Sequence, residues 1–276
     1  MTGLRRELRK HRLGLAVLCL LTVALVVWTC LDPWLRLGNA DGDRLQSLRL
    51  AVLLPAFSPD LSLSALSSIG PVMLAIFGAC VVGSEYRWGT VGGEVALTSR
   101  AEFARRKLAL GAAAAAILVV LALATGMVGA VLATATADGR SGSAEPAPLP
   151  GGPVGLADLA AQVVLTWAGL LLWFSIAALV ALVTRSSFVA VVGTVAYSYL
   201  EVFAAPAVSP ALARVLPANV QVSTLQVFEY LPEASVVSAP VTRAVESLPL
   251  ASLALAAYVA LMAAALVVVS RRLEHR

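Results

Sequence analysis

"SEYRWGTVGGEVALTSRAEFARRK", residues Ser84 to Lys107, is a polar stretch that separates two long apolar runs. It carries eight charged side chains, whereas the runs on either side, Leu66–Gly83 and Leu108–Thr134, carry none. About 20 apolar residues in an α-helix cross the hydrocarbon core of a bilayer, which is ~30 Å thick. This alternation therefore predicts two membrane-spanning helices joined by a compact polar loop.

The composition of the whole chain agrees with this prediction. The 276 residues are 59% hydrophobic and 13% charged, with a mean hydropathy of +0.88, whereas about a quarter of the residues in soluble domains are charged. A bilayer forces backbone groups to form hydrogen bonds within the chain, and strand-like alternation is absent. We therefore expect an all-α integral membrane protein that forms a single domain over residues 1–276.

Six apolar runs are long enough to be membrane-spanning helices. These predicted spans are Leu13–Leu31, Leu66–Gly83, Leu108–Thr134, Leu159–Val183, Phe188–Ala205 and Leu250–Val269. Pro71 in the second span predicts a kink near its start. The stretch Leu50–Phe57 is too short to cross and is interrupted by Pro55, so we expect an interfacial or half-buried helix there.

The positions of lysine and arginine predict the orientation of these spans. Fourteen of the 20 basic residues lie at the N-terminus, in 84–107, at the turn containing Arg185, or at the C-terminus. The positive-inside rule places these four segments in the cytoplasm. Residues 1–12 then form a cytoplasmic interfacial helix, and 206–249 is an extracellular segment whose apolar content predicts short helices dipping into the outer membrane face. The excess of Arg over Lys is compatible with a GC-rich bacterial genome and hence with a multi-pass protein of a bacterial cytoplasmic membrane.

Motifs for catalysis or for binding a cofactor are missing from the sequence. Both histidines, His11 and His275, lie near the chain ends, so no His/Glu metal cluster is expected within the membrane. There is no G-x-S-x-G elbow, no phosphate-binding G-x-x-x-x-G-K-[ST] loop and no C-x-x-C pair. Three cysteines in or beside apolar runs are interpreted as packing residues: Cys19, Cys30 and Cys80. We expect a non-catalytic chain with no cofactor or metal of its own and no nucleic-acid partner.

Ionisable residues are almost absent from the predicted spans. A charge at the bilayer centre costs roughly 2.5 kcal/mol or more, so such residues mark functional paths. The exception is Glu201, near the outer end of the fifth span. Two interpretations are open: a carboxylate that snorkels to the outer interface, or a residue of a substrate path or interhelix contact.

The polar loop itself contains signals for an exit, a turn and a new helix. Tyr86 and Trp88 suit the headgroup region, whereas Glu85 predicts a pairing with Arg87, with an N-terminal arginine or with another protein. Three glycines then permit a reversal, at positions 89, 92 and 93. Ser99 and Glu102 form a capping-box pattern for the next helix. The following basic residues are expected to hold the inner interface: Arg105, Arg106 and Lys107.

The motif "EYRWGT" with a later Leu, Arg and Lys resembles the permease subunits of type-2 ATP-binding-cassette exporters. That family includes drug, bacteriocin-immunity and polysaccharide exporters, and its six-span layout and basic "RRELRK" stretch before the first span make the similarity cover nearly the whole chain. Gly92 and Gly93 differ from the polar or leucine residues usual there. The resemblance implies that this loop is a coupling helix that inserts into an ATPase subunit. The residues expected at that contact are Glu85, Tyr86, Arg87, Gly89, Thr90, Leu97, Arg100 and Glu102, and Lys107 also matches the pattern.

The function implied by this resemblance is the transmembrane subunit of an ATP-driven exporter for a hydrophobic or amphipathic compound. Its expected partners are an ATPase chain that binds ATP and Mg²⁺, a second permease subunit in a homo- or heterodimer, and membrane lipid. Two alternatives remain open: a secondary transporter or channel, and a non-transporting membrane anchor. Ionisable residues lining the spans would favour the first alternative, and the lack of an ATPase partner would favour the second.

Overall fold

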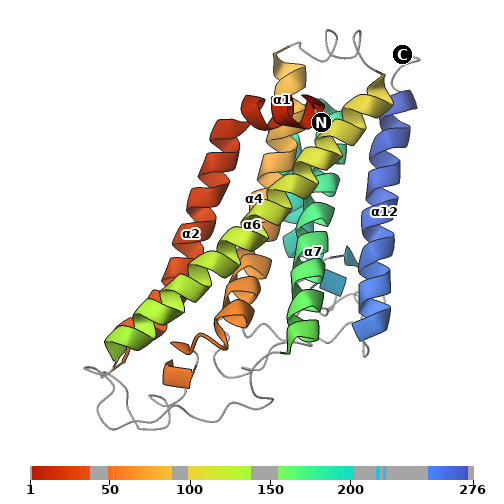
Figure 1. Ribbon diagram of the computed structural model, residues 1–276. Helices are drawn as coiled ribbons and strands as arrows, with labels where there is room; N and C mark the ends of the chain where they lie inside the picture. Colours follow the sequence, from red (N-terminus) through yellow and green to blue (C-terminus); the bar gives the residue numbers. More distant parts are fainter. Residues whose placement is uncertain are drawn as a thin grey trace.

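The computed structural model describes residues 2–37, 49–51, 53–88, 99–137, 155–201, 216–217, 220–221 and 248–272. Their regular secondary structure is entirely helical, as predicted, and the long helices form a bundle (Figure 1). These helices are α1 (Thr2–Lys10), α2 (Arg12–Leu35), α4 (Ser58–Arg87), α6 (Arg100–Ala137), α7 (Leu156–Thr184), α8 (Ser187–Tyr199) and α12 (Leu248–Arg272).

Five of these helices, α2, α4, α6, α7 and α12, are long and apolar enough to cross a membrane. The apolar composition and the lengths of these helices therefore indicate a multi-pass membrane protein. Helix α8 lies at the fifth predicted span but has 13 residues, fewer than the roughly 20 that cross a bilayer. The end predicted for this span, Ala205, lies outside the described residues.

Helix α4 begins earlier than the sequence predicted, at Ser58 rather than Leu66. Pro59 in the first turn and Asp60 beside it favour a helix start. Ser62 then donates to the carbonyl oxygen of Ser58 at 2.6 Å, so a hydroxyl on this apolar helix keeps a hydrogen-bond partner. The predicted start was wrong because a hydropathy window excludes such polar residues. The helix continues through Pro71.

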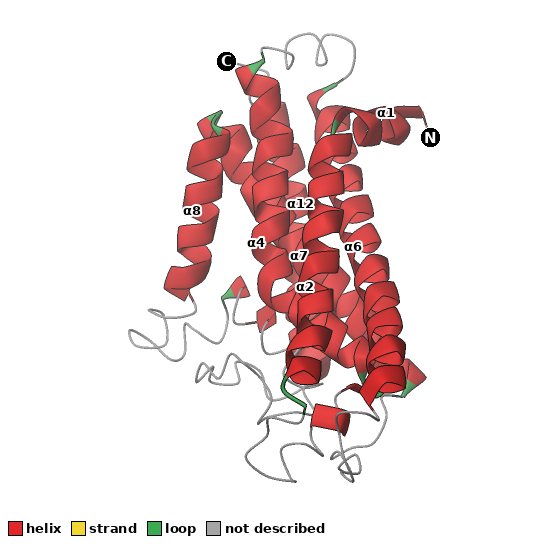
Figure 2. Cartoon of the chain, turned by 90° about the vertical axis from the view of Figure 1, so that its left-hand side faces the viewer, coloured by secondary structure: helices red, strands yellow, loops and turns green. Residues whose placement is uncertain are grey.

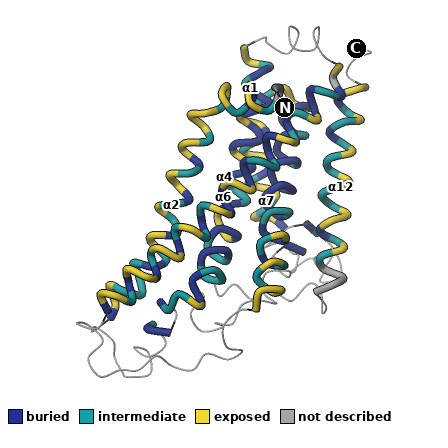
Figure 3. The backbone as a smooth tube through the Cα atoms, viewed as in Figure 1, coloured by how far each residue is buried: buried dark blue, intermediate teal, exposed yellow. Residues whose placement is uncertain are grey.

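The core of the bundle lies along α4 and α7, whose apolar stretches are more deeply buried than those of α2, α6 and α12 (Figure 3). Phe174 of α7 is fully buried and packs against Phe77 of α4, with ring centroids 6.1 Å apart. Helices α2 and α12 turn apolar side chains outward, for example Leu20 and Leu253. Lipid tails would cover such surfaces in a membrane, which explains why so many large apolar residues are exposed.

One end of the bundle, which we call the α1 end, gathers segments far apart in the sequence. Helix α1 lies across it, and α4 ends, α6 begins and α12 ends there (Figures 1 and 2). The turn between α7 and α8 is also there, because Ser187 packs against Gly83 near the end of α4. Arg185 makes this turn with φ 56°, and Ser186 caps α8 by accepting from the amide of Val189 at 3.3 Å.

Part of the predicted outer segment 206–249 lies inside the bundle. Val220 and Gln221 are buried, and Trp173 of α7 donates from Nε1 to Gln221 Oε1 at 2.6 Å. Val220 packs with Leu165 of α7 and Leu255 of α12. These contacts agree with a segment that dips between helices. Between α2 and α4, residues 49–51 are helical, and the buried side chains of 50, 51 and 53 agree with a half-buried helix there.

Candidate functional site: a buried ion cluster at the α1 end

Lys107, near the start of α6, is the centre of a buried ion cluster. Its side chain is fully buried, and Nζ donates to Glu7 Oε2 at 2.6 Å and to Glu85 Oε1 at 2.7 Å. The ammonium also lies 5.1 Å from the centroid of the Phe103 ring, a favourable cation–π distance. The expectation that Lys107 holds the membrane interface was therefore wrong: it pairs inside the protein, while the neighbouring Arg105 is exposed.

Helical periodicity places Lys107 and Glu85 inside the bundle. On α6, Lys107 lies on the same stripe as Phe103, Leu110 and Ala114, all of which are buried; spacings of three and four residues put these side chains on one face. On α4, Glu85 follows buried Val81 at the same spacing. Each of these two charged residues therefore continues an apolar stripe that faces another helix. Because its side chain is buried there, it needs a counter-charge on the helix that it faces.

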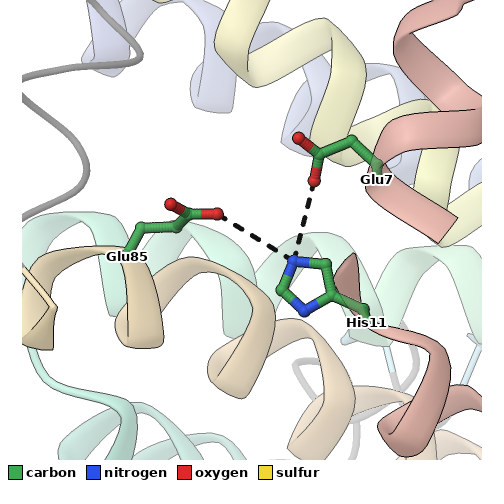
Figure 4. Close-up of side chains that lie close together, drawn as sticks. All are labelled: Glu7, His11 and Glu85. Atoms are coloured by element: carbon green, nitrogen blue, oxygen red, sulfur yellow. Dashed lines mark ion pairs between the residues drawn. The ribbon is translucent and has the colours of Figure 1, made fainter. Parts of the chain in front are cut away.

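Helix α1 supplies the second carboxylate of the cluster. Leu4, Glu7, Leu8 and His11 follow the i, i+3, i+4, i+7 spacing of one helix face. The two leucines pack against the main core, and Glu7 is buried against Lys107. Figure 4 shows the His11 ring between the two carboxylates, with Nε2 3.6 Å from Glu7 Oε2 and 3.9 Å from Glu85 Oε1. An apolar pair and a buried ion pair thus dock α1 on the bundle.

Among the described residues, the lysines and glutamates of the cluster carry matching charges. Lys10 donates to Glu85 Oε1 at 2.6 Å, so two ammonium groups face two carboxylates. Burial alone would raise the pKa of Glu7, but the adjoining His11 and the positive charges of Lys107 and Lys10 outweigh it and lower that pKa to about 2. Glu7 is therefore ionised at neutral pH despite its burial.

Glu7, His11 and Glu85 also resemble a set of metal ligands, since their candidate ligand atoms lie within 4.8 Å of one another. However, the carboxylate oxygens that a cation would use already bind the ammonium of Lys107. A divalent ion would have to displace that ammonium into an apolar surrounding, at a large desolvation cost. The geometry therefore favours an internal ion cluster over a metal centre.

The residues predicted to contact an ATPase occupy different environments at the end of α4. Glu85 is fully buried, and its partners here are Lys10 and Lys107. Tyr86 is half-buried against the core. Arg87 is exposed, and its guanidinium lies 5.9 Å from the centroid of the exposed Trp88 ring. Of the predicted contact residues on α4, Arg87 is therefore exposed to a partner, whereas Glu85 lies inside the bundle.

The start of α6 confirms part of the predicted capping box. The amide of Glu102 donates to Ser99 Oγ at 3.2 Å, as expected, but the Glu102 carboxylate accepts from Arg106 Nε at 3.0 Å. Helix α6 begins at Arg100. The remaining predicted contact residues, Gly89, Thr90 and Leu97, and the pair at 92–93 lie outside the described residues.

Glu201 is buried at the end of α8. Tyr197 of α8 and Tyr258 of α12 both lie close enough to its carboxylate to interact with it electrostatically. The Tyr197 and Trp173 rings are 6.3 Å apart. These surroundings favour the interhelix interpretation of Glu201 over a carboxylate that snorkels to water.

Sequence reasoning missed the roles of Glu7, Lys10, His11 and Lys107 in the cluster. The readable signals were a lysine on an apolar helical stripe and a glutamate among leucines on the docking face of an otherwise basic helix. The sequence alone does not show which of these charged side chains form ion pairs, because the pairing depends on the tertiary arrangement of α1, α4 and α6. Comparisons of the chain with family models, with curated proteins and with solved structures gave no significant match.

Proposed function

We propose that this chain is the permease subunit of an ATP-driven exporter of the type-2 ATP-binding-cassette class. The observation that carries the proposal is the Glu7–Lys107–Glu85 cluster, which joins α1, the end of α4 and the start of α6. The loop with the family-like motif connects the last two of these helices. A partner that binds this loop would therefore act on both of them close to their shared ion pairs.

A buried ion cluster suits the transmission of a motion between helices. Separating Lys107 from either carboxylate leaves a buried charge without its partner, which costs several kcal/mol. Helices α4 and α6 therefore move together with α1 rather than separately. In the proposed cycle, ATP binding favours one arrangement of the two ATPase chains, and the joined helices carry that preference into the bundle. Cargo and ATP must favour different states for such coupling to drive export.

The structure suggests two kinds of residue in the proposed ATPase contact. Arg87 and Trp88 are exposed at the end of α4, so they suit direct contact with the partner, together with the loop that follows. Glu85 is buried and suits a positioning role, since it holds the end of α4 to Lys107. We further propose that the subunit has six spans, of which α8 and the residues after it form the fifth.

Its α1 end would lie in the cytoplasm of a bacterial cell, with the spans in the inner membrane. Two such permeases would form a dimer that exports an apolar cargo.

The partner is tested by affinity purification of the tagged chain from native membranes in mild detergent. We expect an ATPase with a Walker motif to co-purify, and we expect the substitutions Arg87→Ala and Trp88→Ala together to reduce its recovery. Arg36→Ala is the matched control, because Arg36 is exposed at the opposite end of the bundle. Recovery of no ATPase with the unmodified chain would contradict the proposed function.

A further inference from the structure

Helix α1 has a second face that the ion cluster does not use. Arg5, Arg6 and Arg9 are exposed on the side opposite Glu7, and Arg12 continues the row at the start of α2. These four arginines have no acidic partner in the described part of the chain, because the carboxylates nearest to α1 pair with Lys10 and Lys107. Among the described residues, the outward face of α1 is therefore a row of guanidinium groups without a counter-charge beside them, which Arg12 extends.

The row lies at the border of the apolar surface of the bundle. Arg12 is followed directly by Leu13, which is 77% exposed, and then by exposed Val17 and Leu20 on the same side of α2. Such large apolar side chains are covered by lipid tails in a membrane. Helix α1 lies across the end of the bundle at which this apolar surface stops (Figure 1), which is the level expected for lipid headgroups.

We propose that the outward face of α1, residues Arg5, Arg6 and Arg9, together with Arg12 at the start of α2, binds the phosphate groups of anionic phospholipids. A guanidinium presents several N–H donors in a plane and pairs with phosphate oxygens through two hydrogen bonds at once. Clusters of basic residues beside a membrane-spanning helix attract anionic lipids for the same electrostatic reason. The inference concerns the isolated chain and does not depend on transport.

Two observations favour a lipid over an acidic protein surface as the occupant. The first is the continuity of the arginine row with the exposed apolar face of α2. The second is that the apolar side chains of α1, Leu4 and Leu8, already pack on the bundle, so the outward face offers charge without an apolar anchor. Stable protein interfaces centre on buried aromatic or apolar residues, whereas a lipid headgroup needs only charge and hydrogen-bond donors.

The experiment uses the purified full chain in bilayers of phosphatidylcholine with spin-labelled phosphatidylglycerol or spin-labelled phosphatidylcholine. Electron paramagnetic resonance gives the fraction of each labelled lipid that the protein immobilises. We expect a preference for phosphatidylglycerol that weakens with added salt. The triple substitution Arg5→Gln, Arg6→Gln and Arg9→Gln should reduce this preference by at least about fivefold, which is the effect of removing a single such charge, with phosphatidylcholine binding unchanged.

Two further variants make the result specific. The lysine triple variant, Arg5→Lys, Arg6→Lys and Arg9→Lys, keeps the charge and should keep most of the preference. Arg36→Gln is the single-site control, because that arginine is already paired with Asp32 at 2.9 Å, and it should leave the preference unchanged. An unaltered preference in the glutamine triple variant would overturn the proposal. So would a loss of ATPase binding without any loss of lipid preference, because the face would then dock a protein.

Discussion

Lys107 is the residue on which the α1 end depends most. It is fully buried, and two carboxylates accept its hydrogen bonds at 2.6 and 2.7 Å. Burying such an ion pair contributes little net stability compared with apolar packing, but removing one partner is costly because the other charge stays buried. A single substitution in this cluster should therefore lower the free energy of unfolding more than a combined substitution that removes its charges together.

We predict that Lys107→Met lowers the free energy of unfolding by about 3–5 kcal/mol, because Glu7 loses the ammonium that it pairs with and Glu85 keeps only Lys10 of its two lysine partners. Combining it with Glu7→Gln and Glu85→Gln should restore most of that loss. Arg105→Met is the control and should change stability by about 0.5 kcal/mol or less, since Arg105 lies only two residues before Lys107 but is exposed. Thermal unfolding of the detergent-solubilised variants measures these differences. Equal stability of Lys107→Met and the unmodified chain would contradict the role of the cluster.

Glu7 gives the cluster a dependence on pH. Its pKa falls from an ordinary 4.5 to about 2 in the folded chain, so the unfolded state binds the proton more tightly. The stabilisation is therefore complete above about pH 4.5 and is lost as the pH falls toward 2. We predict that the stability difference between the unmodified chain and Glu7→Gln shrinks over this range, as measured by unfolding at a series of pH values. A difference that stays constant with pH would count against an ionised Glu7.

At the scale of helices, the sequence predicted the type of most elements better than their bounds. Hydropathy located all five long helices, because length and apolar composition are properties of each segment alone. It left the first residues of α4 out of the predicted span, since Ser62 is polar but meets its hydrogen-bonding need within its own helix. The docking of α1 could not be predicted, because it depends on which helix ends meet in space.

Gly83 is required where α4 passes the start of α8. A Cβ at this position would lie 2.6 Å from the backbone nitrogen of Ser187, which cannot move aside without shifting α8. We predict that Gly83→Ala lowers stability by about 1–3 kcal/mol. Gly193→Ala is the matched control on α8, because a Cβ there meets nothing within 4 Å, and it should be neutral or slightly stabilising. A similar unfolding temperature for both variants would exclude this close helix contact.

At the scale of the whole molecule, the α1 end collects the segments that the sequence predicted on one side of the membrane. The end of α4, the start of α6 and the turn at Arg185 all lie at this end of the bundle (Figure 2). Charge counting could predict this grouping because the basic residues cluster beside alternate helix ends. It could not distinguish Lys107, which points inward, from Arg105, which points outward, because both carry the same charge.

The predicted orientation is tested by labelling single cysteines in intact cells with a membrane-impermeant thiol reagent. In a background in which the free cysteines 19, 30 and 80 are replaced, Ser99→Cys marks the α1 end and Ala135→Cys marks the opposite end; both positions are exposed. We expect labelling at 135 and none at 99 until the cells are opened. The reverse pattern would place α1 outside the cell.

The central claim is that the cluster couples a partner ATPase to the bundle. Its most direct test is export by the complex of the chain with the ATPase that co-purifies, reconstituted in vesicles. The variant to use combines Lys107→Met, Glu7→Gln and Glu85→Gln, which removes the ion pairs without leaving a buried charge at these three positions. We predict that this complex assembles and hydrolyses ATP but exports little cargo per ATP. Export per ATP equal to that of the unmodified complex would contradict the claim.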